Sequence, residues 1–259
     1  QSNNDYSTNI STLTAEDYFY KAYNSSDYQY QIDNYTKCLK INPNWYPANV
    51  YFNRGLVYKR LGKYEKAISD YTRAIEINSY YDEAYCNRGV IYVMLGNNED
   101  AINDVNKAIK INPDDAIAYN TRGLVYKSLG KFEDAIVEYT RAIRIDPDFY
   151  DAFINRGIIY KIIKNYENAI DDYARAIKIN PDDFSAYYNR GNLYLKFGKY
   201  ENAIDDYNRV IKINPDYAYV YNGRAVAKKR LKLEYCSDFK KACDLGHNQG
   251  CENYDKVCK

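Results

Sequence analysis

Six arginines and six acidic residues recur in step along this chain and could form charge-assisted hydrogen bonds. The arginines are Arg54, Arg88, Arg122, Arg156, Arg190 and Arg224. An acid follows sixteen residues after each of the first five and fourteen after the last, at Asp70, Asp104, Glu138, Asp172, Asp206 and Asp238. Because a planar guanidinium can give two parallel hydrogen bonds to one carboxylate, this pattern predicts structural ion pairs. The alternative is an arginine ladder that faces a phosphorylated or acidic ligand, but such a ladder needs no acid in step with it.

An asparagine directly precedes four of these arginines, and it suggests a different chemistry. The four are Asn53, Asn87, Asn155 and Asn189, while Thr121 interrupts the row and Gly223 ends it. A side-chain amide both donates and accepts hydrogen bonds. A row of amides could therefore hold the backbone of an extended peptide, whatever the peptide's sequence. The alternative is that these amides only tie neighbouring helices together.

The predicted peptide-binding surface combines amides with apolar residues that lie about one helical turn away. Its residues are Asn53, Leu56, Asn87, Val90, Asn120, Leu124, Asn155, Ile158, Asn189 and Asn192. The apolar part of this stripe would be exposed without a ligand, which favours peptide binding. Lys59, Lys127 and Lys161 lie on its rim and would weakly favour acidic partners.

Little in the sequence suggests catalysis. The chain has one His, His247, no phosphate-binding loop and no nucleophile motif. Acid pairs such as Asp171-Asp172 recur because a longer pattern recurs. We expect no catalytic residue, no cofactor and no metal site. The net charge of +1 indicates neither nucleic-acid nor membrane binding, and no apolar run is long enough to span a bilayer.

The elements that must position these residues form a repeat of 34 residues. Glycines follow one another at this interval at Gly55, Gly89, Gly123, Gly157 and Gly191, and an alanine column lies twelve residues after them. Within 116–149, the pattern predicts a first helix from about Ala116 to Leu129, which stops at Gly130, and a second that starts near Glu133 and ends before Pro147. Each repeat is therefore expected to be a pair of helices.

The spacing of these columns resembles the tetratricopeptide repeat signature, with Tyr119, Gly123, Tyr126, Ala135, Tyr139 and Pro147 in its positions. Tyr replaces the usual Trp and Arg replaces the usual Leu. The resemblance implies an all-α, right-handed α-solenoid of antiparallel helix pairs. We expect a disordered lead-in at 1–11, repeat units at 12–45, 48–81, 82–115, 116–149, 150–183, 184–217 and 218–245, and a capping helix at 246–259.

The resemblance also implies a place for the asparagines. In tetratricopeptide solenoids the first helices line the concave groove, and some of them hold peptides through such an asparagine ladder. Family members that bind cytosolic heat-shock proteins use a cationic pair to clamp a C-terminal carboxylate. In this chain the corresponding positions are the asparagine position of each repeat and the position four residues before it. They carry no cationic pair, as Glu83 and Asn87 illustrate. We therefore expect no heat-shock carboxylate clamp.

Four cysteines near the C-terminus are symmetrically spaced. Cys243 and Cys251 bracket a turn, and Cys236 and Cys258 lie seven residues outside them. Two antiparallel helices would bring inner to inner and outer to outer, and the segment also resembles the bridged turns of secreted Sel1-like repeats. We predict disulfides 243–251 and 236–258. The alternatives are a reduced cap or, less favoured, a zinc site.

These observations predict an adaptor that binds a protein or peptide segment and is monomeric. The disulfides predict an extracytoplasmic, secreted or periplasmic location, which the start at Gln1 without Met suits, whereas a reduced cap would fit the cytoplasm. Two alternatives remain open: a self-assembling structural protein, or a subunit of a larger envelope or secretion complex. Growth of the particle with concentration in light scattering would favour self-assembly.

Overall fold

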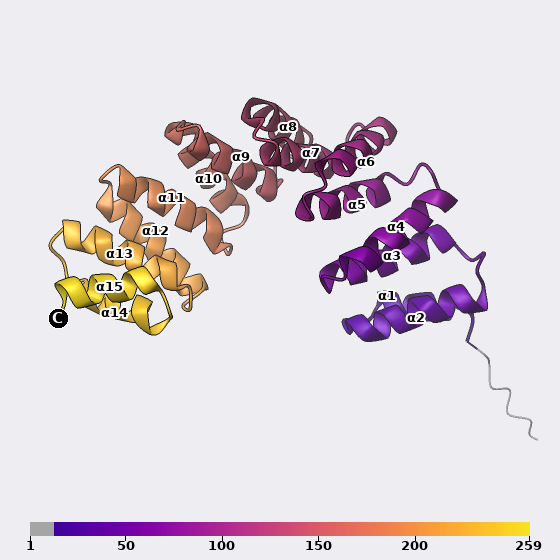
Figure 1. The fold of residues 1–259 in the computed structure, drawn as a ribbon, viewed down its shortest axis with the longest axis horizontal. Helices are drawn as coiled ribbons and strands as arrows, with labels where there is room; N and C mark the ends of the chain where they lie inside the picture. The colour runs from indigo at the N-terminus through magenta and orange to yellow at the C-terminus, as the bar shows by residue number, and fades with distance from the viewer. Residues whose placement is uncertain (1–12) are drawn as a thin grey trace, which may run out of the picture. The chain divides into compact units, whose positions relative to one another are not determined.

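The computed structural model describes residues 13–259, which form fifteen α-helices and no strand (Figure 1). Their bounds are α1 (Ala15–Tyr23), α2 (Tyr28–Ile41), α3 (Pro47–Arg60), α4 (Tyr64–Ile77), α5 (Asp82–Met94), α6 (Asn98–Ile111), α7 (Ala116–Ser128), α8 (Phe132–Ile145), α9 (Tyr150–Ile162), α10 (Tyr166–Ile179), α11 (Phe184–Lys196), α12 (Tyr200–Ile213), α13 (Ala218–Arg230), α14 (Cys236–Asp244) and α15 (Asn248–Val257). The predicted lead-in, 1–11, lies outside the described residues.

The chain forms two compact units, one that ends at Ser128 and one that starts at Leu129. In the first unit, α1 packs on α2, α3 on α4 and α5 on α6, and each second helix also contacts the next first helix. The second unit repeats this arrangement in α9 with α10, α11 with α12 and α13 with α14, and α15 packs on α14. Stacked helix pairs of this kind make an α-solenoid, which confirms the predicted fold class.

Residues with a left-handed backbone conformation lie in the turns between paired helices. Gly62, Gly96, Gly130 and Gly198 have φ values of 67°, 76°, 70° and 72°. The predicted helix end at Gly130 is thus confirmed, and α8 ends at Ile145, before Pro147. Lys164 and Lys232 take the same turn position with φ values of 64° and 58°. A side chain in this conformation costs about 1–2 kcal/mol relative to glycine, so these two turns carry strain.

The glycines inside first helices make room for a buried tyrosine of the second helix. A Cβ added at Gly157 would lie 2.8 Å from Cε1 of Tyr173, and one at Gly55 would lie 2.7 Å from Cε1 of Tyr71. Both distances are too short for real carbon contacts, so any larger residue would force the helices apart. At these two positions glycine is required because the tyrosine ring lies directly against the backbone of the first helix. Gly89 faces the smaller Val105, whose Cγ2 would lie 3.0 Å from such a Cβ.

The hydroxyl groups of these buried tyrosines differ in whether they have a hydrogen-bond partner. Those of Tyr71, Tyr139 and Tyr173 find no hydrogen-bond partner among the described residues. The hydroxyl of Tyr207 donates to Oδ1 of Asn192 at 2.8 Å. The difference follows from the residue fifteen positions earlier, which is Asn192 for Tyr207 and an aliphatic residue for the other three.

This difference predicts opposite effects of the same substitution. Tyr207→Phe should lower the free energy of unfolding by about 1 kcal/mol, because Asn192 then loses a partner. Tyr173→Phe should leave it unchanged or raise it by up to about 1 kcal/mol, because a buried hydroxyl without a partner is removed. Urea unfolding followed by circular dichroism would measure both, and each variant controls for the other. Equal losses in the two variants would contradict the assignment.

Candidate functional site

The arginine column forms buried, two-bonded ion pairs within the helix pairs. In Arg156, Nε and Nη2 donate to the two carboxylate oxygens of Asp172 at 2.9 and 2.7 Å. The same arrangement holds for Arg54 with Asp70, Arg88 with Asp104, Arg190 with Asp206 and Arg224 with Asp238. Each carboxylate lies on the second helix of the arginine's own pair. The predicted pair of Arg122 with Glu138 stays a prediction.

A third hydrogen bond, not predicted from the sequence, ties several of these arginines to the preceding helix pair. Nη1 of Arg156 donates to the Thr140 hydroxyl at 2.9 Å. Nη1 of Arg88 donates to Thr72 at 2.7 Å, and Nη1 of Arg224 donates to Asn208 at 2.6 Å. The corresponding position before Arg190 is Ala174, which cannot accept this bond. A Thr or Asn sixteen residues before the Arg was therefore the sequence signal for this contact.

The electrostatics of these pairs fit a structural role. Burial alone would lower the pKa of Arg156, but the hydrogen bond and charge of Asp172 outweigh it and raise the pKa above its ordinary value. Asp172 is only 4% exposed. The rings of Phe153 and Tyr160 also lie near the guanidinium, with centroids 5.7 and 5.9 Å from Cζ. The guanidinium of Arg156 is therefore engaged by other residues of the protein.

The asparagines lie partly exposed on the first helices, and their amides are already oriented by hydrogen bonds. Nδ2 of Asn87 donates to the backbone oxygen of Glu83 at 2.9 Å, and Oδ1 accepts from Nζ of Lys59 at 2.7 Å. Asn189 repeats both contacts with Ser185 and Lys161, at 3.0 and 3.1 Å. These bonds tie neighbouring first helices together. Because an amide nitrogen carries two hydrogens, each Nδ2 keeps one N–H that is not engaged in these bonds.

The sequence predicted the position of two lysines beside this surface but not their hydrogen bonds to the asparagines. The sequence placed Lys59 and Lys161 on its rim, and the structure shows each bound to an asparagine 28 residues later. That repeated spacing was the available signal. Burial lowers the pKa of the Lys59 ammonium. The ammonium therefore supplies partly desolvated N–H donors beside the amide.

An acidic edge lies at the opposite ends of the same helices. Burial and the neighbouring carboxylates of Asp82 and Asp115 raise the pKa of Glu83. Burial, followed by the charge of Asp183, raises the pKa of Asp151. Both acids lie one turn before an asparagine of the row. The first-helix surface is consequently acidic at one edge and basic at the other.

Two residues of the predicted surface have another role. Asn120 is only 7% exposed, so its predicted place on an accessible surface is wrong. Asn192 accepts the Tyr207 hydroxyl and thereby serves the packing of α11 on α12. The apolar residues Leu56, Val90, Leu124 and Ile158 are half-buried. They can still offer contact area.

The C-terminal cysteines form two nested disulfides between α14 and α15. The Cα atoms are 5.7 Å apart in Cys236–Cys258 and 4.4 Å apart in Cys243–Cys251. His247, between them, accepts a hydrogen bond from the Gly250 N–H and so caps the start of α15. Cys38 and Cys86 are unpaired and buried. The C-terminal cap is thus covalently closed.

Within 13–259, His, Cys, Asp and Glu side chains form no group of three or more that could hold a metal ion. No helix in that range combines the length and the apolar composition that a membrane span requires.

Comparison with known families gives matches along most of the chain. Models described as tetratricopeptide repeats cover residues 48–217 in six overlapping or adjoining stretches: 48–81, 70–103, 91–130, 123–162, 159–198 and 184–217. The comparison with curated proteins gave no match.

Solved structures show the same fold. A tetratricopeptide repeat protein from Parabacteroides merdae ATCC 43184 is 25% identical, with a TM-score of 0.66 over 95% of this chain and 99% of that one. YrrB, described as a TPR protein with an unusual peptide-binding site, is 21% identical, with a TM-score of 0.60 over 72% of this chain and 98% of that one. PilF of Pseudomonas aeruginosa is 19% identical, with a TM-score of 0.69 over 82% and 93%.

Proposed function

Because this chain belongs to the tetratricopeptide repeat family, we propose that it is a non-enzymatic adaptor that holds an extended peptide segment of a partner protein on its first helices. Proteins of this family are typically interaction scaffolds. The amide row supplies hydrogen bonds to the peptide backbone, and the half-buried apolar residues supply contact area. The peptide-binding site named for YrrB supports a similar use of the fold here.

The observation that carries this proposal is the orientation of the asparagine amides. Asn87 and Asn189 are each held by a backbone oxygen and a lysine, so they lose little freedom when a ligand binds. Each leaves an N–H for a peptide carbonyl oxygen. The basic edge at Lys59 and Lys161 adds further donors. A partner segment that offers backbone carbonyls and a few carboxylates toward that edge suits this surface.

The proposal includes a location outside the cytosol. Disulfides persist in oxidising compartments and are rare in the cytosol. The two bridges at the C-terminus support this location.

Substitution of two asparagines tests the function. Peptides selected from a displayed library against the native chain should bind Asn87→Ala/Asn155→Ala about 5- to 140-fold more weakly, since each of the two lost hydrogen bonds contributes about 0.5–1.5 kcal/mol. Fluorescence anisotropy with labelled peptides gives the dissociation constants. The measured chains must share one circular-dichroism melting curve.

The matched control is Asn103→Ala/Asn168→Ala, which removes two exposed asparagines from the second helices α6 and α10. It should bind the selected peptides as the native chain does. If instead both double variants bind equally well, the peptides use another surface and the amide row is only a tie between helices.

A further inference from the structure

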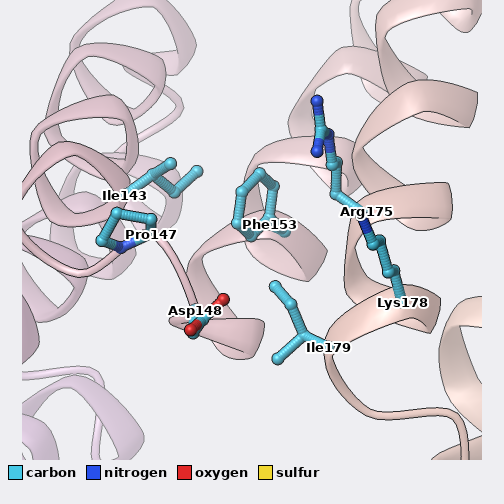
Figure 2. A pocket seen from close by; sticks show the side chains of 7 residues that line it. All are labelled: Ile143, Pro147, Asp148, Phe153, Arg175, Lys178 and Ile179. Atoms are coloured by element: carbon cyan, nitrogen blue, oxygen red, sulfur yellow. The ribbon is translucent and has the colours of Figure 1, made fainter.

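A pocket of about 440 Å³ lies in the second unit (Figure 2). It is lined by Ile143, Pro147, Asp148, Phe153, Arg175, Lys178 and Ile179. These residues come from the end of α8, the loop after it, α9 and the end of α10. Phe153 precedes Asn155 by two residues, hence about 200° round α9, since a helix turns about 100° per residue. The pocket therefore opens on a different face of α9 from the asparagines.

The pocket is apolar inside and charged at its edges. Phe153 is 7% exposed, and Ile143 and Ile179 are half-buried. Figure 2 shows Phe153 between Ile143 and Pro147 on one side and the α10 residues on the other. Such a recess can enclose one aliphatic or aromatic side chain.

Two exposed cations stand on the α10 side of this recess. Arg175 and Lys178 are three residues apart on one helix, so their side chains leave the same face. Neither forms an ion pair with any carboxylate of the described residues, whereas Arg156 and Arg190 are paired. Asp148 lies on the loop side. An incoming carboxylate would thus be attracted to α10 and repelled from the loop.

The positive charge continues on the neighbouring second helices. Arg144 on α8 and Lys212 on α12 are exposed in the last turns of their helices, and Arg209 is exposed about one turn before Lys212. Cations are favoured near helix C-termini by the helix dipole, so the row alone has a structural explanation. The apolar recess beside Arg175 and Lys178 has no such explanation. A recess at the equivalent positions one repeat later is lined by Tyr187, Arg209 and Lys212, but Asp205 and Asp206 line it as well. The recess over Phe153 differs because Asp148 is the one acid in its lining.

We propose that this surface of the second unit binds an acidic peptide segment with one large apolar residue. The apolar side chain enters the recess over Phe153, and carboxylates on either side of it pair with Arg175 and Lys178. Arg175 can bind a carboxylate with two hydrogen bonds. A membrane surface suits the geometry less well, because the apolar groups here are recessed and would not reach into lipid. The site is separate from the asparagine row, so either can exist without the other.

The probe for this proposal is the fluorescein-labelled peptide acetyl-Asp-Glu-Asp-Leu-Glu-Asp-Glu-amide, followed by fluorescence anisotropy in low-salt buffer. The native chain should bind it saturably. Arg175→Glu/Lys178→Glu should weaken binding at least about thirtyfold, since two attractive contacts become repulsive. A peptide with Ser in place of Leu should bind about tenfold more weakly, because the recess stays unfilled.

The matched control is Lys63→Glu/Lys66→Glu, which changes the net charge by the same amount at two exposed lysines of the first unit. It should leave the affinity within about twofold of the native value, because neither lysine lines the recess. Asn87→Ala/Asn155→Ala should also bind the acidic peptide normally, which separates this site from the asparagine row.

Four results would overturn the proposal: no saturable binding by the native chain, equal weakening by both charge-reversal variants, equal affinity of the Leu and Ser peptides, or binding to phosphatidylserine vesicles without binding to the peptide. The second would indicate non-specific attraction, and the last would assign the cations to a lipid surface. Because Arg175 and Lys178 are exposed, the variant is expected to fold, and its melting curve verifies this.

Discussion

Arg156→Met should destabilise the second unit by about 3–5 kcal/mol, the usual cost of leaving one member of a buried ion pair without its partner. The substitution leaves the carboxylate of Asp172 only 4% exposed and without its two strongest donors. It also removes the bond from Arg156 to Thr140, which joins one helix pair to the next. Urea unfolding of the native and variant chains measures the loss.

The direct nature of the pair is tested by a double-mutant cycle. Asp172→Ala alone should also be costly, but Arg156→Met/Asp172→Ala should cost at least about 2 kcal/mol less than the sum of the single losses, because no unpaired charge remains buried. Arg175→Met, at an exposed arginine of the same unit, should change stability by no more than about 0.5 kcal/mol. Fully additive losses would show that Arg156 and Asp172 do not interact.

Removal of both disulfides should release α15 from the rest of the chain. Gly250 is the only buried residue of this helix, so little apolar burial holds it in place. The Cys236–Cys258 bridge joins residues 22 positions apart. Closing a loop of about this length stabilises by about 3 kcal/mol in the chain-entropy model, and the nested Cys243–Cys251 bridge adds less. Cys→Ser substitution at all four positions should therefore let α15 open locally.

Hydrogen exchange measured by mass spectrometry detects this opening. Backbone amides of α15 should exchange about 100-fold faster in the four-serine variant, since about 1.4 kcal/mol corresponds to a tenfold change. Amides of α9 to α12 serve as the internal control and should keep their protection, because a solenoid transmits little beyond neighbouring repeats. Unchanged protection of α15 in the variant would show that packing alone holds the cap.

The fold was largely predictable because each repeat obeys local rules. The 34-residue columns, the helix period and the punctuation by Gly130 and Pro147 each depend on residues close in the chain. Arg156 and Asp172 could be paired for the same reason, since their spacing places them on facing helices of one hairpin. The cysteine spacing predicted the disulfide pairing for the same reason, because two antiparallel helices joined by a short turn bring each cysteine close to one partner.

Contacts between successive helix pairs were not predictable in the same way. Which residues of a helix become covered depends on how the next helix pair packs against it. The spacing of residues within one repeat does not specify that packing. The bond of Lys59 to Asn87 and the bond of Lys161 to Asn189 were both decided there. The recess at Phe153 needs three helices to exist at all. The sequence by itself thus determined the repeat and its ion pairs, and only the stacking of repeats decided which polar groups face a ligand.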